Sequence, residues 1–351
     1  MALSDDIALY ALGRWMHETR PNRIDSLCLN HIQAKSTCTA CSDVCPAEVN
    51  VHTDHIAWAS CTGCNACITA CPTSALNESR SSFEAVTSAL DNGNGYTVFA
   101  CDLHDGPCDV KRPCLGTLPW DLLAGVAVSQ KLVMKLQHCN SCPHTELVGQ
   151  TKELVRTLKA FLGPELFAER VTMTTPAEST EQAGQRKRRA FEQVAHVVQT
   201  EASSILDDLD RDAPTMSCYR AFLLDALEKA DPQPRVTWKT LEEDGGCRAC
   251  GACVAMCPHH ALSLELPDDP HANDAPQAKL VHDASRCTQC GMCYISCPEE
   301  TIGGWGRLRA TAAEARVEFP LDVSYCEKCG KPFKPTSTET RCTSCSRFRY
   351  L

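Results

Sequence analysis

Apolar and polar positions alternate through residues 96–174 in the manner of short strands separated by helices. Runs such as YTVFAC have strand length and strand composition, whereas the intervening segments repeat apolar residues every three or four positions. The pattern predicts strands at 96–101, 131–137 and 169–175, a helix at 118–130 that begins near Pro119, and a helix at 144–163 that ends at Gly163. Strands and helices in this order predict a small α/β domain.

Two further segments with different residue patterns follow this region. Residues 176–240 are polar with helical periodicity and are expected to form a connector, whose basic run Arg186–Arg189 we interpret as a solvated helix face. Further on, ALSLEL at 261–266 and AKLVHD at 278–283 alternate like short strands around a turn region rich in Pro, Asp and Asn. These two runs predict a hairpin.

The composition is unusual in its cysteine content, with 26 cysteines in 351 residues. The net charge of −10, from 34 basic and 44 acidic side chains, argues against nucleic acid as the main partner, because a phosphate-binding surface needs a basic excess. Asp5 and Asp6 stand where a secretion signal would be basic, and no apolar run approaches the roughly 20 residues that span a bilayer. We therefore expect a cytoplasmic protein without a membrane span, in which clustered cysteines stay reduced and bind metal.

Two cysteine phrases near the C-terminus, CRACGACVAMCP and CTQCGMCYISCP, both read C-x2-C-x2-C-x3-C-P. In this pattern three cysteines bind one [4Fe–4S] cluster and the fourth, placed before proline, binds the second cluster of a pair. The expected ligand sets are Cys247, Cys250 and Cys253 with Cys297, and Cys287, Cys290 and Cys293 with Cys257. This part of the chain resembles two-cluster bacterial ferredoxins, which place a hairpin between the two phrases.

A second pair of phrases lies near the N-terminus, and one of them lacks a cysteine. CTGCNACITACP is complete, but the earlier KSTCTACSDVCP has Lys35 where the first cysteine should stand. We expect Cys28 to supply the missing ligand from a longer loop; a three-iron cluster or an absent cluster is the alternative. The expected sets are Cys28, Cys38 and Cys41 with Cys71, and Cys61, Cys64 and Cys67 with Cys45.

The C-terminal tail carries two C-x2-C knuckles joined by a short polar loop. They are formed by Cys326 and Cys329, and by Cys342 and Cys345. This arrangement predicts a structural zinc ribbon with four thiolate ligands. Rubredoxin-like iron or a fifth cluster is the alternative.

The cysteines of the middle region fall at the ends of predicted strands, where open α/β sheets place their sites. The candidate ligands are Cys101, Cys114, Cys139 and Cys142, with Cys108 in a loop. VFACDLHDGPCDVKRPCLGTLPWDLLAGV and LQHCNSCPH resemble the iron–sulfur delta subunit of hydrogenases linked to heterodisulfide reductase, and this resemblance implies a [2Fe–2S] cluster. A second zinc site, a redox-active Cys139–Cys142 pair and buried structural thiols are the alternatives. The lone Cys218 is interpreted as a core residue.

The sequence as a whole predicts an α+β, multi-domain protein in which two ferredoxin-like 2[4Fe–4S] modules flank the small α/β domain. The predicted domains are an N-terminal module at 1–94, the α/β domain at 95–175, the helical connector at 176–240, the C-terminal module at 241–318 and the zinc-ribbon tail at 319–351. Four [4Fe–4S] clusters, one zinc ion in the tail and a [2Fe–2S] cluster or zinc in the middle domain are the expected cofactors.

Up to four one-electron carriers in one chain predict electron transfer. We found no G-x-G-x-x-G, P-loop or G-x-S-x-G motif, so we expect a non-catalytic, polyferredoxin-like subunit that relays single electrons to or from a catalytic oxidoreductase. A formate dehydrogenase or a hydrogenase is the partner suggested by analogy of architecture. Two alternatives stay open: a thiol/disulfide reductase with its site at Cys139 and Cys142, fed by the ferredoxin modules, and a maturation or scaffold factor.

Overall fold

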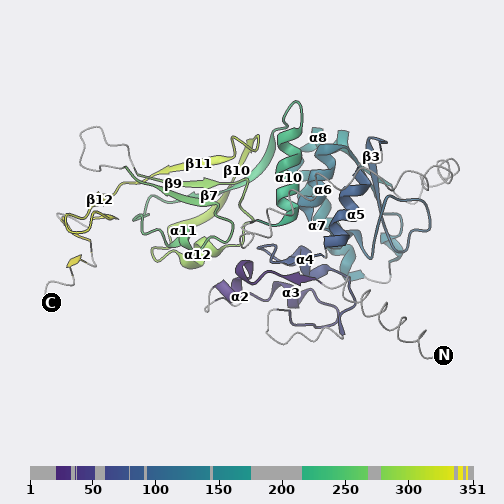
Figure 1. Ribbon diagram of the computed structural model, residues 1–351, viewed down its shortest axis with the longest axis horizontal. Coiled ribbons are helices and arrows are strands. Elements are labelled where there is room, and N and C mark those ends of the chain that lie inside the picture. Colours follow the sequence, from purple (N-terminus) through teal and green to yellow (C-terminus); the bar gives the residue numbers. More distant parts are fainter. Residues whose placement is uncertain are drawn as a thin grey trace. The chain divides into compact units, whose positions relative to one another are not determined.

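The chain forms two compact units, Met1–Pro234 and Arg235–Leu351 (Figure 1). The structure, a computed structural model, describes residues 21–32, 36, 38–51, 60–78, 80–90, 93–142, 145–174, 216–267, 278–335, 339–342 and 345–346. The boundary between the units falls inside the segment expected to be a connector, 176–240. The basic run Arg186–Arg189 lies outside the described residues.

A four-stranded parallel sheet lies at the centre of the first unit, in the order β4-β3-β5-β6. The strands are β3 (Tyr96–Cys101), β4 (Val110–Arg112), β5 (Lys131–Lys135) and β6 (Val171–Thr174). Phe99 of β3 is paired with Met134 of β5, and both side chains are fully buried. The three predicted strands are confirmed, while β4 was missed because three residues are too few to show a period.

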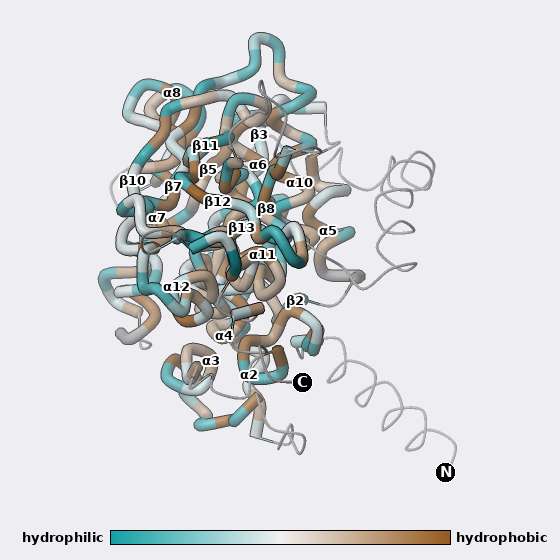
Figure 2. Tube along the Cα trace, turned by 90° about the vertical axis from the view of Figure 1, so that its left-hand side faces the viewer, coloured by the Kyte–Doolittle hydropathy of each residue, from teal (hydrophilic) through white to brown (hydrophobic). Residues whose placement is uncertain are grey.

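Helices cover this sheet, and the two predicted ones are confirmed. They are α5 (Arg80–Leu90), α6 (Trp120–Ser129), α7 (Thr145–Leu162), α8 (Pro164–Arg170) and α10 (Cys218–Lys229). Pro119 precedes the first turn of α6, and Gly163, with φ of 82°, separates α7 from α8. Residues of α6 are apolar almost throughout (Figure 2), as expected of a helix that is buried on every side.

The helix α10 lies beside α6 and belongs to the first unit (Figure 1). Gly125 allows the close approach, because a Cβ atom there would lie 2.5 Å from the Phe222 ring. The buried guanidinium of Arg220 donates to both carboxylate oxygens of Asp121, over 3.0 and 3.2 Å, and lies 5.0 Å from the centre of the Trp120 ring. A charged pair therefore joins two helices inside an apolar interface.

The N-terminal cysteine phrases lie on short elements beside the α/β domain. These elements are β1 (Asn22–Arg23), the 3-10 helix η1 (Asp25–Leu27), α2 (Leu29–Ile32), α3 (Ala40–Asp43), α4 (Ala66–Ala70) and β2 (Leu76–Asn77). The strands β1 and β2 pair antiparallel. Just after β2, the buried Glu78 forms a 2.9 Å ion pair with Arg112, and its amide donates to the hydroxyl of Tyr219 over 3.1 Å. These contacts fasten the N-terminal phrases to β4 and α10.

The described part of the second unit contains three antiparallel sheets, the smallest of them in the tail. The two larger sheets are β7 (Val236–Glu243) with β10 (Ile302–Ala310), and β8 (Leu262–Glu265) with β9 (Lys279–Asp283) and β11 (Arg316–Pro320). The predicted hairpin strands are confirmed as β8 and β9. The helices α11 (Ala252–Ala255) and α12 (Met292–Ser296) follow the cysteine loops, and β12 (Ser324–Tyr325) and β13 (Pro332–Phe333) form the tail.

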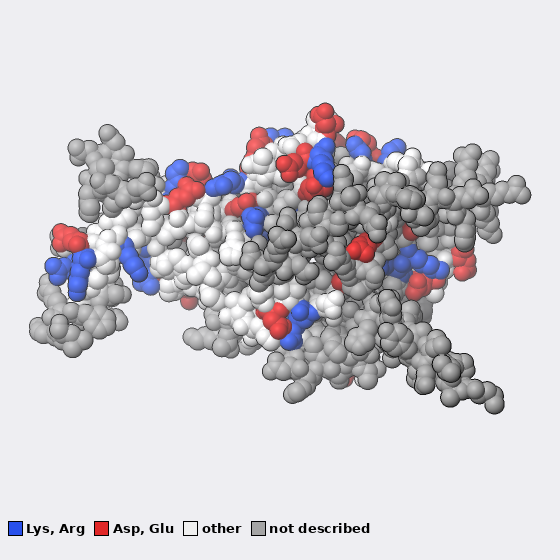
Figure 3. All heavy atoms as spheres, in the orientation of Figure 1, with Lys and Arg blue, Asp and Glu red and all other residues white. Residues whose placement is uncertain are grey.

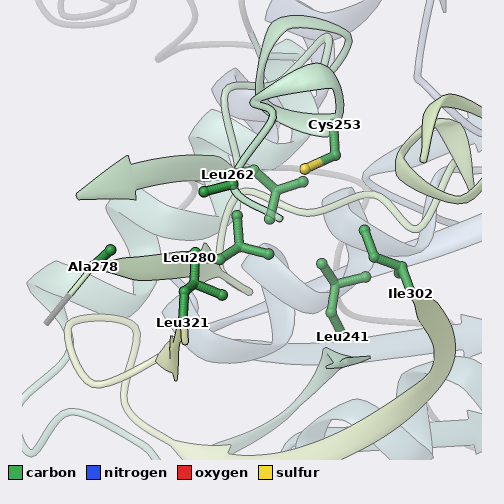
Figure 4. Packing of buried hydrophobic residues seen from close by; sticks show 8 residues of the cluster. Leu241, Cys253, Leu262, Ala278, Leu280, Ile302 and Leu321 are labelled. Atoms are coloured by element: carbon green, nitrogen blue, oxygen red, sulfur yellow. The ribbon is translucent and has the colours of Figure 1, made fainter. Parts of the chain in front are cut away.

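The core of the second unit lies directly beneath a cysteine. Figure 4 shows the sulfur of Cys253 beside Leu262, with Leu241, Leu280 and Ile302 packed close by. All five residues are at least nine-tenths buried. The cysteine-bearing loops are therefore supported by packed aliphatic side chains.

The described surface carries charges of both signs. In Figure 3, basic and acidic side chains lie interspersed over the described part of the face shown. Pairs such as Arg235–Glu314 at 2.6 Å and Arg248–Glu299 at 2.8 Å belong to this surface. Of the helices in the described ranges, none is long and apolar enough to cross a membrane.

Replacing Arg220 by Met is expected to lower the free energy of unfolding of the first unit by about 3 to 5 kcal/mol, because the carboxylate of Asp121 would stay buried without a partner. The double variant Asp121→Leu/Arg220→Met is expected to recover most of that loss. Urea unfolding followed by tryptophan fluorescence measures both. A double variant no more stable than the single one would contradict this account of the pair.

Candidate metal centres

The two C-terminal phrases surround two separate cavities. The first cavity is lined by Cys247, Cys250, Cys253 and Cys297, and the second by Cys257, Cys287, Cys290 and Cys293. Each cavity therefore takes three cysteines from one phrase and one from the other, and these are the groupings expected from the sequence. Aliphatic side chains such as Leu280 and Ile302 close the first cavity on its inner side.

The local backbone explains how three cysteines come to face one cavity. Gly251 and Gly291 have φ of 74° and 77°, in the left-handed region that glycine adopts without strain, and each starts the short helix that carries the third cysteine. The loop before it turns so that the amide two residues beyond the first cysteine donates to that sulfur. Ala249 donates to Cys247 and Gln289 to Cys287, both over 3.4 Å.

The fourth cysteines receive hydrogen bonds of another kind. The amide of Ala261, four residues on, donates to the sulfur of Cys257 over 3.3 Å, and the hydroxyl of Thr301 lies 3.6 Å from the sulfur of Cys297. Burial raises the pKa of the Cys297 thiol, but the Thr301 hydroxyl and nearby amides outweigh burial and lower it. Donors aimed at sulfur favour the thiolate, which is the form that binds metal.

The third cysteine of each complete phrase has the opposite environment. Burial, followed by the charges of neighbouring cysteines, raises the pKa of the Cys67, Cys253 and Cys293 thiols to about 12. These sulfurs are poor places for negative charge unless a cation is bound nearby. Soft donors alone, gathered around an apolar-walled cavity, fit an iron–sulfur cluster in their chemistry.

In the N-terminal module, the structure brings Cys28 to the incomplete phrase. One cavity is lined by Cys28, Cys38, Cys41 and Cys71. The side chain of Asn30 binds the backbone of Cys38 twice, donating to its carbonyl over 2.8 Å and accepting from its amide over 3.2 Å. These bonds hold the Cys28 loop against the phrase that lacks a first cysteine.

The hydrogen bonds of Cys28 match those of the first cysteines elsewhere. Burial raises its pKa, while the amides of Asn30 and His31 donate to its sulfur. The Asn30 amide is two residues beyond the cysteine, as Gly63 is beyond Cys61, where the amide-to-sulfur distance is 3.5 Å. Cys28 therefore has the local environment of a first ligand although it lies outside the phrase.

The remaining N-terminal cysteines are Cys45, Cys61, Cys64 and Cys67. After burial, the charges of Cys64, Cys41, Cys61 and Cys45 raise the pKa of Cys67, so this thiol also lies near Cys41 of the first group. The amides of Val49 and Ala75 donate to the sulfurs of Cys45 and Cys71 over 3.3 and 3.2 Å, four residues on in each case, as at Cys257. The N-terminal phrases thus repeat the hydrogen bonds of the C-terminal ones.

The middle-domain cysteines gather at the carboxyl ends of β3, β4 and β5. Burial, followed by the charges of Cys101, Cys114 and Cys142, raises the pKa of Cys139. Burial and the charges of Cys142 and Cys101 likewise raise the pKa of Cys114. Its sulfur lies 3.9 Å from the hydroxyl of Thr151. Cys139 and Cys114 are therefore each within electrostatic reach of the other three candidate ligands.

The other residues considered in the middle domain differ in position. Burial raises the pKa of Cys108. The neighbouring charges that act on this thiol are those of Lys111, which lowers the pKa, and Asp109, which raises it, rather than those of cysteines. His104 is buried, its Nδ1 pairs with the side-chain amide of Gln137, and its ring lies 6.2 Å from that of His138.

The lone Cys218 begins α10. Burial raises the pKa of its thiol to about 12, and its sulfur donates to the side-chain oxygen of Asn77 over 3.9 Å. This environment agrees with the expected packing role.

The tail cysteines form the tightest group of sulfurs. Within the described ranges, the only set of three or more metal-ligating side chains whose ligand atoms all lie within 4.8 Å is Cys326, Cys329, Cys342 and Cys345. Gly330, with φ of 68°, turns the first knuckle, and its amide donates to the carbonyl of Cys326 over 2.7 Å. Burial alone would raise the pKa of the Cys326 thiol, but amide donors from Cys342, Cys329 and Lys328 lower it to about 6. This group could hold one metal ion.

Comparison with known protein families identifies two of these regions. A family described as "4Fe-4S dicluster domain" matches residues 246–301, and one described as "4Fe-4S binding domain" matches residues 55–77. No curated protein matches the chain. The chain therefore contains ferredoxin modules of the bacterial type, with iron–sulfur binding domains in both units. The incomplete first phrase lies outside both matches.

Sequence reasoning missed two polar residues at these centres. Asn30 was invisible because its role depends on a loop that folds back to Cys38. His282, which is fully buried and lines the second C-terminal cavity, did leave a signal. In AKLVHD it is two residues from Leu280, so strand alternation places a polar side chain on the face that points to the core.

We expect the tail to hold one metal ion per chain, which Cys342→Ser removes while the iron content stays the same, because the tail thiols are separate from the ferredoxin cysteines. Elemental analysis for zinc and iron after anaerobic gel filtration measures this. Cys218→Ser is the matched control. Equal metal loss in both variants, or none in Cys342→Ser, would contradict the assignment.

Proposed function

We propose that the protein is an iron–sulfur electron carrier that relays single electrons between a catalytic oxidoreductase and an acceptor. The observation that carries this proposal is that three cavities are each lined by four cysteines, three from one segment and one from another. Cys45, Cys61, Cys64 and Cys67 would make a fourth set. Each set would bind one [4Fe–4S] cluster, a one-electron carrier. Several such clusters in one chain would pass electrons from one cluster to the next or store several electrons.

The N-terminal clusters would use Cys28 in place of the missing first cysteine. Its position in a common cavity with Cys38, Cys41 and Cys71 supports this ligand over a three-iron cluster. The amide donors to its sulfur support the same choice, because they match those of the first cysteines in the complete phrases.

The middle domain would hold a [2Fe–2S] cluster. A tetrahedral zinc site with Zn–S bonds of about 2.3 Å places its sulfurs roughly 3.8 Å apart. The tail meets this condition, with 3.8 Å between the sulfurs of Cys329 and Cys342, whereas the middle cysteines are absent from the closely spaced groups of described residues. Their wider spacing suits a binuclear cluster better than a single ion.

The same thiols are poorly suited to a disulfide-reductase reaction. A nucleophilic cysteine needs a lowered pKa, whereas burial raises the pKa of Cys139, one of the two cysteines of that alternative. We therefore favour cluster ligation over the reductase alternative.

The arrangement of the first unit supports electron exchange between its sites. The helix α4, which carries Cys67, lies against the 3-10 helix η3 (Leu115–Thr117), which directly follows Cys114. A cluster on Cys67 and a cluster on Cys114 would therefore be neighbours. The partner oxidoreductase would be a formate dehydrogenase or a hydrogenase, with the tail as a structural zinc ribbon.

Anaerobically reduced protein is expected to deliver roughly four electrons per chain, or five if the middle domain holds a redox-active cluster, to a one-electron dye. Optical and paramagnetic titrations count them and show whether they leave singly. The double variant Cys139→Ser/Cys142→Ser is expected to retain the four cubane electrons. Electrons that leave only in pairs, and not at all from that variant, would favour the thiol reductase instead.

Cys28→Ala is expected to lower the iron content by about one to four atoms per chain, because its cluster would lose one iron or the whole cubane. The oxidised variant should then show the signal of a three-iron cluster or a loss of cubane signal. Cys108→Ala, which removes a thiol outside the predicted sets, is the control. Unchanged iron in Cys28→Ala would show that this cysteine is not a ligand.

A further inference from the structure

The two C-terminal cavities differ in what lies beneath them. The strand β9 runs under both, with Leu280 lining the first cavity and His282, two residues on, lining the second. Strand β8 gives the matching pair, with Leu264 at the first cavity and Leu262 at the second. The second cavity is thus lined by imidazole, from His282 on β9 and also from the buried His259, whereas β9 presents an aliphatic side chain to the first.

His282 has neighbours on three strands, β8, β11 and β7. The residue is the middle member of the cross-strand set Leu262–His282–Val317, and none of its surface is exposed. Its Nδ1 accepts the backbone amide of Leu241, in β7, over 3.3 Å. A neutral ring that accepts at Nδ1 carries its proton on Nε2, so the outer nitrogen is a donor.

The Nε2 atom has no hydrogen-bond partner among the described residues and is fully buried. A buried donor left without an acceptor costs about 1 to 3 kcal/mol. The residue shares its cavity with Cys257, Cys287, Cys290 and Cys293, whose sulfurs and bound sulfides are the acceptors this cavity would offer. A cluster in the cavity therefore supplies the partner that the protein itself does not.

We propose that the Nε2–H group of His282 donates a hydrogen bond to a sulfur of the cluster held by Cys257, Cys287, Cys290 and Cys293 and raises its reduction potential. This inference rests on the proposed function, because it needs a cluster in that cavity. Reduction adds one electron and makes the cluster more negative by one charge, without proton transfer. A donor aimed at sulfur stabilises that added charge, so the potential rises. The electron then rests preferentially on this cluster.

The first cavity provides the internal comparison. The residues that line it include no imidazole, and the β9 side chain that lines it is Leu280. Its cluster would have only the amide and hydroxyl donors described above. A difference in potential between the two clusters is thus built into one strand.

Two substitutions separate the hydrogen bond from the packing of the ring. His282→Asn places an amide oxygen where Nδ1 stands, so the bond from the Leu241 amide is kept while the donor to sulfur is lost. His282→Gln places an amide nitrogen where Nε2 stands and keeps that donor. We expect a lower potential for the second-cavity cluster in His282→Asn, a potential near that of the native protein in His282→Gln, and no change in the first-cavity cluster in either.

The measurement is a redox titration of the full chain followed by electron paramagnetic resonance, with the iron content determined on the same samples. In addition, native protein labelled with ¹⁵N-histidine should show hyperfine coupling of histidine nitrogen to one partly reduced cluster, and this coupling should vanish in His282→Asn. A native protein without histidine coupling overturns the inference even if a variant does not fold. Because His259 lines the same cavity, an observed coupling is assigned to His282 by its loss in His282→Asn.

Three results would overturn the inference. They are a native protein without histidine coupling, a coupling that persists in His282→Asn, and equal potentials in the native protein and His282→Asn. If the native protein carries its iron and cubane signals in these cases, only the role of His282 fails. A native chain without a cluster in this unit would overturn the proposed electron carrier as well.

Discussion

Ionised sulfur is difficult to bury, and the architecture of this protein follows from that difficulty. In both ferredoxin modules, burial and neighbouring cysteine charges raise the pKa of the third cysteine of each complete phrase to about 12, at Cys67, Cys253 and Cys293. A thiolate at such a site is stable only beside a cation and hydrogen-bond donors. Iron would provide the cation, and backbone amides donate to other cysteines of the same modules, among them Cys45, Cys71, Cys257 and Cys287. Cluster binding and folding of these loops are therefore expected to be coupled.

The position of the fourth cysteine of each phrase determines how each module must fold. Because this cysteine lines the cavity of the other phrase, one phrase cannot form a site alone, and segments distant in the sequence must lie side by side. In the C-terminal module the pairing of β7 with β10 and of β8 with β9 does this, above a core of leucine and isoleucine. In the N-terminal module the pairing is only two residues long, and Asn30, Glu78 and Arg112 add the polar contacts that complete it.

Local patterns in the sequence were sufficient for most of this architecture. Residue spacing defined the cysteine phrases, and periodicity identified β3, β5, α6 and α7, since both depend on near neighbours. Long-range packing was not accessible in the same way. The connector expected at 176–240 contains α10, which packs on α6 through Gly125, and it also contains the start of β7, which belongs to the other unit. The donor at His282 is likewise defined only once β7, β9 and the second cavity are brought together.

The count of iron and inorganic sulfide per chain on anaerobically purified protein tests the central claim most directly. Four cubane clusters predict about 16 irons with as many sulfides, and a [2Fe–2S] cluster in the middle domain would raise the iron to about 18. Zinc determined on the same sample should be about one atom per chain, held by the tail. About eight irons with two or more zinc ions would mean that one ferredoxin module does not carry clusters, and this result would contradict the electron-relay account.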